Sequence, residues 1–244
     1  MKRGLMLLSG GLDSVATAYY VKKKLKYDVL DVLYVDYGHR AHEQELFCVN
    51  KIASLLSSTV HTVSMDWLGD LSGSYINRTG TFPKTTTTDL GNVKKGKKEL
   101  LNWWVPCRNS LLLLAGLAHA ESTYLNTKKK YDIFIGFKDE GKIPMKDATK
   151  AFLDDMNALV NNATHHGFYT FKAPLLKYDK TDVVKLGETL NIPWEYTYSC
   201  YTGSGFITVN NKKIPLHCGT CLNCQLRKKG FYWSAVTDPS RYTQ

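Results

Sequence analysis

Short apolar runs alternate with one-sided apolar stretches along the first quarter of the chain. Residues 5–8 and 29–35 are mostly apolar runs of the length typical of buried strands, and residues 59–63 predict a third strand. Between them, one helix is predicted from residues 15–21 onward and another over residues 43–56, where apolar side chains recur every three or four positions. This order predicts a parallel sheet with right-handed crossovers, and therefore an α/β fold.

The second half of the chain continues this alternation. Residues 131–137 form another apolar run that predicts a buried strand. Helices are predicted over residues 111–120 and 151–160 from their apolar content. A further helix is predicted to start at Lys180, because Asp179 directly before it is a favourable N-cap residue.

Two stretches depart from this pattern. Residues 70–98 lose their periodicity, and the loop over 84–98 is interpreted either as irregular surface or as a lid over a ligand. Near the end of the chain, residues 206–214 alternate around two asparagines. This pattern predicts a β-hairpin, carried by an insertion over residues 203–215.

A glycine-bearing turn connects the first predicted strand to the first predicted helix, and its sequence is Ser9-Gly10-Gly11-Leu12-Asp13-Ser14. Glycines allow close approach of the backbone to a ligand, and the unpaired N–H groups at a helix start attract anions. The turn lacks the G-x-x-x-x-G-K-[ST] pattern of a Walker A loop and the G-x-G-x-x-G pattern of dinucleotide-binding proteins. The sequence therefore predicts an anion-binding turn of another kind, with an ordinary glycine turn before a helix as the alternative.

Composition and charge limit the possible functions. The 244 residues suffice for one large α/β domain, and the net charge of +10 suits ATP and anionic substrates and permits nucleic acid as a partner. The excess lysines are scattered in small clusters, which is more typical of a solvated surface than of a nucleic-acid groove. No apolar run is long enough to span a membrane. The apolar start also stops at Ser9, too early for a secretion signal, so a cytoplasmic location is expected.

Six cysteines in such a chain favour metal binding or catalysis over disulfides. Four of them are spaced to converge on one ion, and these are Cys200, Cys218, Cys221 and Cys224. Zinc is the default ion for a closed structural site of four thiolates; an iron–sulfur cluster and free core cysteines are the alternatives. Cys48 is interpreted as a small core residue, and Cys107 as a neighbour of the ligand pocket beside Arg108.

The turn at residues 9–14 resembles the PP-loop of the ATP pyrophosphatases, which cleave ATP between the α- and β-phosphates. Within that superfamily the chain resembles the 7-cyano-7-deazaguanine (preQ0) synthases over nearly its whole length. Five stretches carry this resemblance, in order, and they are residues 9–14, 36–46, 105–109, 173–180 and 198–231. It implies a Rossmann-like parallel sheet with two parts, a nucleotide-binding α/β domain over 1–195 and a zinc-binding region over 196–244 packed on it.

The resemblance also implies a reaction. The carboxylate of 7-carboxy-7-deazaguanine attacks the α-phosphate of ATP, ammonia displaces AMP to give the amide, and a second adenylation yields the nitrile, preQ0. The protein positions groups and neutralises phosphate charge in such a reaction. The expected cofactors are structural Zn²⁺ and a Mg²⁺ ion that bridges the phosphates. A homodimer is implied, with ammonia and the deazaguanine acid as small-molecule partners and nucleic acid not required.

Site residues follow from the matched motifs. The resemblance assigns reaction roles to Asp13, Ser14, Lys180 and Arg108. It assigns nucleotide contacts to Leu8, Ser9, Gly10, Gly11, Leu12, Asp13, Ser14, Val15, Ala16, Asp36 and Arg40. Trp103 and Trp104 are interpreted as core residues, with stacking on a heterocycle as the alternative.

Three departures from the family pattern bear on the substrate. His39 stands where the family usually has glutamine, with Ala41 inserted after the arginine, and Cys107 stands where it usually has glycine. The family's Tyr-Pro-Asp-Cys-Arg segment is replaced near residues 139–147, which retain the proline. A variant that stops at the amide, or that uses a related acid, is therefore a second hypothesis.

Two further hypotheses belong to other functional classes. The basic charge favours a PP-loop enzyme that modifies tRNA, although the sequence shows no obvious RNA-binding module and its cysteine-rich end opposes this hypothesis. A zinc-knuckle protein that binds nucleic acid on a degenerate nucleotide fold is the non-enzymatic alternative. The intact turn at residues 9–14 argues against that alternative.

Overall fold

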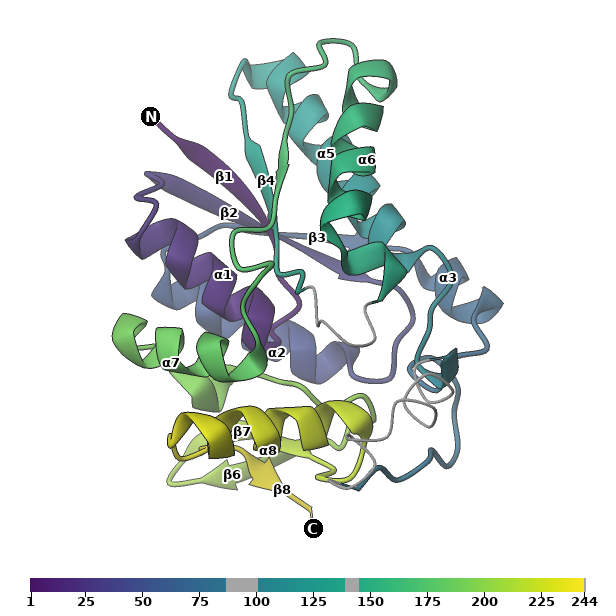
Figure 1. Ribbon diagram of the computed structural model, residues 1–244, viewed down its shortest axis with the longest axis vertical. Helices are drawn as coiled ribbons and strands as arrows, with labels where there is room; N and C mark the ends of the chain where they lie inside the picture. The colour runs from purple at the N-terminus through teal and green to yellow at the C-terminus, as the bar shows by residue number, and fades with distance from the viewer. Residues whose placement is uncertain (87–100, 139–144, 244) are drawn as a thin grey trace.

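The structure is a computed structural model that describes residues 1–86, 101–138 and 145–243. Its centre is a parallel five-stranded sheet with the strand order β3-β2-β1-β4-β5 (Figure 1). The strands are β1 (Arg3–Leu7), β2 (Val29–Asp36), β3 (Val60–Ser64), β4 (Asp132–Ile135) and β5 (Phe171–Lys172). The predicted parallel α/β fold is confirmed.

Helices cover both faces of this sheet (Figure 1). The larger helices of the α/β part are α1 (Leu12–Lys23), α2 (His42–Leu55), α5 (Arg108–Thr127), α6 (Lys150–Ala163) and α7 (Lys180–Leu190). Alternate residues of β1 enter two separate apolar cores, because successive strand side chains point to opposite faces. Leu5 and Leu7 pack in the core that contains Leu113 of α5. Met6, together with Leu8 directly after the strand, packs in the core of α1, α2 and α7.

A second, smaller sheet lies in the C-terminal region. It has the order β6-β7-β8, made of β6 (Phe206–Val209), β7 (Lys212–His217) and β8 (Arg241–Tyr242). Strands β6 and β7 pair antiparallel, and Asn210 and Asn211 both have positive φ (50° and 60°) at their turn. Such angles suit a two-residue hairpin, so the predicted hairpin is confirmed. The two-residue strand β8, which pairs parallel to β7, was not predicted.

One buried arginine ties this region together. Helix α8 (Leu222–Ser234) carries Arg227, which is 0% exposed. Its guanidinium donates to the Trp194 carbonyl and to the hydroxyls of Thr197 and Ser199, and it pairs with Asp238 at 3.2 Å. Because these partners lie on both sides of residue 195, α8 is fastened to the end of the α/β part. The predicted division at 195/196 itself stays a prediction.

Several predicted boundaries change. Helix α1 begins at Leu12, directly on the glycine turn, and α5 extends well beyond the predicted 111–120 at both ends. The structure also contains short elements that were not predicted, namely β5, α3 (Asp66–Leu71), and the 3-10 helices η2 (Lys146–Ala148) and η3 (Trp194–Tyr196). The predicted 84–98 loop falls largely outside the described residues. At its described start, the N–H of Thr85 donates to the carbonyl oxygen of Thr220 at 2.8 Å.

No helix in the described parts of the chain combines the length and the apolarity that crossing a membrane requires.

A glycine in α7 is expected to be intolerant of substitution. A Cβ atom built on Gly187 would lie 1.8 Å from Cζ2 of the buried Trp194. We expect Gly187→Ala to lower the free energy of unfolding by about 3 kcal/mol, because neither the helix nor the indole can move aside without losing contacts. Denaturant unfolding measures this, with Lys185→Ala on the exposed face of the same helix as the control. Equal stability of the two variants would show that the indole relaxes freely.

Candidate functional site

A cavity of about 340 Å³ opens at the carboxyl ends of the central strands. Leu7 of β1, Val35 of β2 and Ile135 of β4 contribute to its walls. In the order β3-β2-β1-β4-β5, the direction of winding reverses between β1 and β4. Ligands of doubly wound sheets bind at such a reversal point, so the cavity occupies the expected place for a site.

The glycine turn forms one side of this cavity. Gly10 has φ +75°, which favours glycine, and a Cβ there would lie 3.0 Å from Cβ of Cys48. The Ser14 hydroxyl donates to the Gly11 carbonyl at 3.1 Å, and the N–H of Ser9 donates back to the Ser14 Oγ at 3.3 Å. Helix α1 starts at this turn without a side-chain cap. Its first N–H groups are therefore directed at the position where an anion would bind.

The end of β4 presses against the same turn. A Cβ on Gly136 would lie 2.7 Å from both N and Cα of Ser14. Only glycine allows the strand to approach the loop so closely. The shape of the glycine turn is therefore fixed by a residue more than one hundred positions away in the sequence.

Two lysines converge on Asp13 at the start of α1. Lys180, the first residue of α7, lies with Nζ 2.5 Å from Asp13 Oδ2, and Lys138 lies with Nζ 3.5 Å from Oδ1. Burial, the largest single effect, raises the pKa of Asp13, but the charges and hydrogen bonds of Lys180 and Lys138 together lower it below its ordinary value. Asp13 is therefore an anion that holds two ammonium groups at the cavity wall.

Lys138 was not singled out from the sequence. It lies two residues beyond Gly136 and only 4% of its side chain is exposed. The available signal was its position just after a buried strand, where parallel sheets place ligand-binding groups.

Arg108 lies on another side of the cavity, at the first position of α5. Burial, the largest effect, would lower the pKa of its guanidinium, but Tyr37, Tyr201 and Asp147 together raise it. Arg108 is therefore a fixed cation that can hold a carboxylate or a phosphate. The neighbouring Asn109 donates to the Asp147 carbonyl at 3.0 Å and so fastens α5 to η2.

An aromatic pair completes the wall near Arg108. Trp103 is 3% exposed, and its ring centroid lies 4.9 Å from that of Tyr201. Both residues contribute to the cavity lining. The predicted core role of Trp103 is therefore confirmed, and the residue also faces the ligand space.

The structure brings most of the predicted site residues to the cavity. Those that line it are Leu8, Ser9, Gly11, Leu12, Asp13, Ser14, Arg108 and Lys180. Five others are not in the lining formed by the described residues, and these are Gly10, Val15, Ala16, Asp36 and Arg40. Their nucleotide contacts stay predictions.

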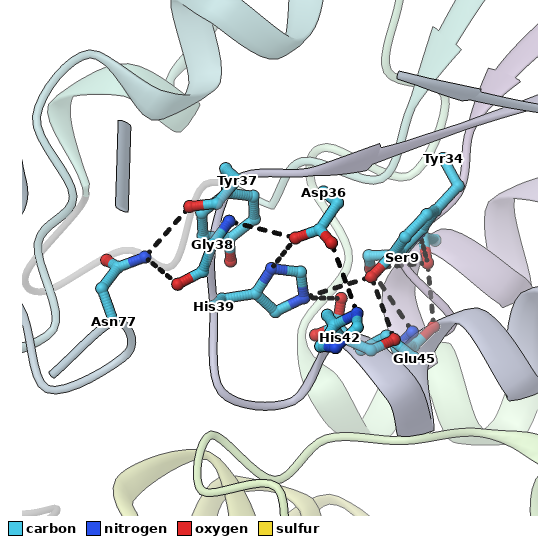
Figure 2. Close-up of polar contacts among 11 residues, drawn as sticks. Ser9, Tyr34, Asp36, Tyr37, Gly38, His39, His42, Glu45 and Asn77 are labelled. Carbon is cyan, nitrogen blue, oxygen red and sulfur yellow. Dashed lines mark hydrogen bonds and ion pairs between the residues drawn. The ribbon is translucent and has the colours of Figure 1, made fainter. Parts of the chain in front are cut away.

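Physical reasons for these exceptions are visible. Val15 and Ala16 are fully buried in the core on the inner side of α1. The Arg40 guanidinium donates to the carbonyl oxygen of Gly80 at 3.1 Å and lies 5.8 Å from the ring of Phe82. Asp36 accepts a hydrogen bond from the N–H of Gly38 and also contacts His39 and His42 (Figure 2).

The four predicted cysteine ligands lie together. Their Sγ atoms are all within 4.8 Å of one another and all four residues are buried. The Sγ atoms of Cys218 and Cys224 are 3.9 Å apart, close to the roughly 3.8 Å expected for a tetrahedron with bonds of about 2.3 Å. Backbone N–H groups of Thr202, Cys218, Thr220 and Cys221 donate to two of the sulfurs. The group therefore fits a single metal ion.

Comparison with known proteins identifies the family. The sequence model of the family described as "Queuosine biosynthesis protein QueC" matches residues 3–234. The chain belongs to the QueC family. Curated relatives named "7-cyano-7-deazaguanine synthase" match this chain over almost its whole length. The protein of Methanococcus maripaludis is 32% identical (98% of each chain), and that of Pyrococcus abyssi is 33% identical (99% of this chain and 98% of the relative).

Family membership confirms the resemblance drawn from the five sequence stretches. Together with the parallel sheet and the cysteine group, it also confirms the predicted fold class. The divergent segment near 139–147 is described only from Met145 onward, and residues 139–144 lie outside the described part of the chain.

Cys107 occupies a position whose backbone favours glycine. It is the N-cap residue of α5 with φ 55° and ψ 12°, in the left-handed region. It is exposed, and it is not among the described residues that line the cavity, which is not what the sequence predicted. Cys48, in contrast, is fully buried in the core as predicted.

We expect Cys107→Gly to raise the free energy of unfolding by about 1 kcal/mol, because the left-handed conformation strains a residue with a Cβ. Denaturant unfolding under reducing conditions measures the change. Cys107→Ala is the matched control and should give no gain, since alanine keeps the Cβ. A gain of the same size with alanine would assign the effect to loss of the thiol instead.

Proposed function

We propose that this QueC-family protein is an ATP-dependent carbon–nitrogen ligase that makes 7-cyano-7-deazaguanine from 7-carboxy-7-deazaguanine and ammonia. The names of the full-length relatives support the overall conversion. The observation that carries the reaction type is the convergence of the uncapped start of α1 and three cationic side chains on one cavity. These side chains belong to Lys138, Lys180 and Arg108.

The geometry suggests a division of labour within the cavity. The turn around Ser9 and Ser14, with the lysines held by Asp13, would bind the β- and γ-phosphates as the leaving diphosphate. Arg108 would bind the carboxylate or the α-phosphate that it attacks. The site thus makes the acid oxygen a better leaving group by attaching AMP to it. When bound, Mg²⁺ would supply further neutralisation of phosphate charge.

Two adenylations, one for each oxygen atom of the carboxyl group, account for the nitrile. In the first, the acid forms an acyl-adenylate and diphosphate leaves; ammonia then displaces AMP and gives the amide. In the second, the amide oxygen attacks another ATP, and loss of AMP with two protons from nitrogen leaves the nitrile. Both rounds use the same phosphate-binding groups, so one cavity suffices for the sequence of steps.

We assign the cysteine group to a structural Zn²⁺ ion. Four thiolates close the coordination sphere, which leaves no position for a reacting water. An iron–sulfur cluster would divide the four thiolates among two or four irons and so spread them wider than the observed group. We also propose that the protein is a homodimer, as the family resemblance implies.

The product mass tests this function. The purified protein is incubated with 7-carboxy-7-deazaguanine, ATP, Mg²⁺ and ammonium, and the deazaguanine products are identified by mass spectrometry. We expect the nitrile, with AMP and diphosphate, and loss of both products in Ser14→Ala. A product that stays at the amide would replace the proposal by the amide-forming alternative. ATP turnover that requires tRNA instead of the acid would replace it by the tRNA-modifying one.

A further inference from the structure

A buried histidine, His39, lies between the carboxylates of Asp36 and Glu45 (Figure 2). The Nε2 atom of His39 is 2.9 Å from Oε2 of Glu45, and its Nδ1 is 3.6 Å from Oδ1 of Asp36. Only 1% of the His39 side chain is exposed. Glu45 and Tyr34 line the cavity, and the Tyr34 hydroxyl lies 3.3 Å from the same Nε2.

The cluster reaches the surface on its other side. Oδ2 of Asp36 is 3.3 Å from Nδ1 of His42, whose side chain is 45% exposed. These contacts lie in series from the cavity to solvent, in the order Glu45, His39, Asp36, His42. The first is a hydrogen bond; the next two are ion-pair contacts of 3.6 and 3.3 Å, which must shorten before a proton can pass. An imidazole between two carboxylates can accept a proton on one nitrogen and release one from the other.

Glu45 differs from the other carboxylate of the described cavity lining. Asp13 is paired with two lysines and has the role of holding them. Glu45 faces the imidazole of His39 and the cavity. A small cation that enters the cavity would find acceptors on the Glu45 carboxylate and the Tyr34 hydroxyl. Burial, with the charges of Glu45 and Asp36, raises the pKa of Tyr34, so this hydroxyl stays neutral.

The proposed reaction creates a need for such a site. At neutral pH the nitrogen substrate is mostly ammonium, whose lone pair is occupied by a proton. One proton must leave before the nitrogen can attack the acyl-adenylate, and a second leaves when the new C–N bond becomes an amide. Because both protons are released inside a cavity rich in cations, a route to solvent would speed turnover.

We propose that Glu45 binds ammonium and removes its proton, and that His39 passes this proton through Asp36 to His42 at the surface. The Glu45 carboxylate takes a proton from ammonium and leaves ammonia. In this relay neutral His39 carries its hydrogen on Nδ1, so that Nε2 accepts the proton from Glu45 while Nδ1 releases one to Asp36, and the ring returns to the Nδ1–H tautomer before the second proton passes. The carboxylate is thereby restored for the second proton. This inference rests on the proposed function; Glu45 is a catalytic residue in it, and His39 acts through Glu45.

Other titratable groups surround the relay and are included in its pH behaviour. On β2 and the following loop these are Tyr34, Asp36 and Tyr37, whose ring stacks on His39 at 4.2 Å. Burial raises the pKa of Tyr37, against the opposing effect of Arg108 on α5. On α2 they are His42, Glu45 and Cys48; burial raises the pKa of the Cys48 thiol. The tyrosines and the thiol therefore stay neutral near pH 7 and do not contribute to the pH response.

The dependence on ammonium concentration tests the proposal. Amide formation is measured at saturating ATP and acid, with varied total ammonium, between pH 6.5 and 8.5. If the protein binds ammonium, its KM for total ammonium stays constant over this range. A protein that takes up dissolved ammonia would instead show a KM that falls about tenfold per pH unit, as the ammonia fraction rises. We expect the first behaviour, and the second would overturn the role of Glu45.

Variants separate the two residues. In Glu45→Gln, the KM for total ammonium should fall as the pH rises, as expected for a protein that takes up dissolved ammonia. The reason is that the glutamine side chain cannot take a proton from ammonium. His39→Gln keeps a hydrogen bond to Glu45 but cannot relay; we expect its kcat to fall about tenfold at pH 6.5, with little change in KM and partial rescue by added imidazole. His61→Gln, on β3, is the control and should match the unmodified protein. An unchanged kcat in His39→Gln across the range would overturn the relay.

A further assay distinguishes failure of the relay from failure of the proposed function. It measures the exchange of labelled diphosphate into ATP, with the acid present and ammonium absent. Exchange in the unmodified protein shows that adenylation occurs without nitrogen. Exchange combined with unchanged ammonium kinetics in both variants would reject the relay alone. Absence of exchange and of AMP formation would reject the proposed function itself.

Discussion

Replacing Lys180 with alanine is expected to lower kcat/KM for ATP by about 10³-fold, equivalent to about 4 kcal/mol of transition-state stabilisation. The variant loses a charge that we place on the leaving diphosphate. It also leaves the partly buried Asp13 carboxylate without its nearest cation, and that carboxylate would then repel the phosphates.

The effect is measured as release of AMP and diphosphate at varied ATP concentration. Lys180→Arg keeps the positive charge and should recover part of the loss. Lys185→Ala removes an exposed lysine from the same helix and should change the rate less than twofold. Activity of Lys180→Ala within threefold of the unmodified protein would show that Lys180 does not contact the phosphates.

Loss of the metal ion is expected to have the second large effect. We expect Cys224→Ser to bind less than a tenth of the metal of the unmodified protein and to unfold at a temperature at least roughly 10 °C lower. Cys224 is fully buried at the start of α8, and its removal leaves three thiolates in an apolar setting. Helix α8 also carries Arg227, which donates to Trp194 and Thr197. Loss of the metal should therefore destabilise the structure on both sides of residue 195.

Metal analysis and thermal unfolding of the same samples measure both quantities. Cys48→Ala is the matched control, since Cys48 is equally buried but lies outside the cysteine group. It should keep its metal and lose only about 1 kcal/mol of stability. Full metal content in Cys224→Ser would contradict the assignment of this residue as a ligand. Visible absorbance typical of an iron–sulfur cluster in the unmodified protein would contradict zinc.

Local sequence patterns predicted the parts of the site that are local in the structure. The turn at residues 9–14 could be recognised because strand, glycines and helix start are contiguous. The cysteine group could be recognised because three of its members are separated by only two residues each. The hairpin around Asn210 was likewise predicted from adjacent residues, since positive φ angles are favourable for asparagine.

Features that depend on distant parts of the chain were missed. Lys138 reaches Asp13 only because β4 pairs with β1, and nothing in the sequence specifies that pairing. The role of Gly136 as a contact surface for Ser14 depends on the same pairing. Arg40 and Asp36 lie in a matched motif, yet in the structure they contact Gly80 and two histidines. A motif defines which residues are neighbours in sequence, but the fold decides which of them line the cavity; the nucleotide contacts of Asp36 and Arg40 stay predictions.

The most direct test of the central claim, that an acid oxygen of the substrate attacks the α-phosphate in this cavity, follows the oxygen atoms. 7-Carboxy-7-deazaguanine labelled with ¹⁸O in both carboxylate positions is converted with ATP and ammonium, and the AMP is examined by mass spectrometry. We expect two AMP molecules per nitrile, each with one ¹⁸O atom. The first AMP takes its labelled oxygen from the acid and the second takes it from the amide, and the diphosphate is unlabelled. Unlabelled AMP, or ¹⁸O in inorganic phosphate with formation of ADP, would contradict the claim.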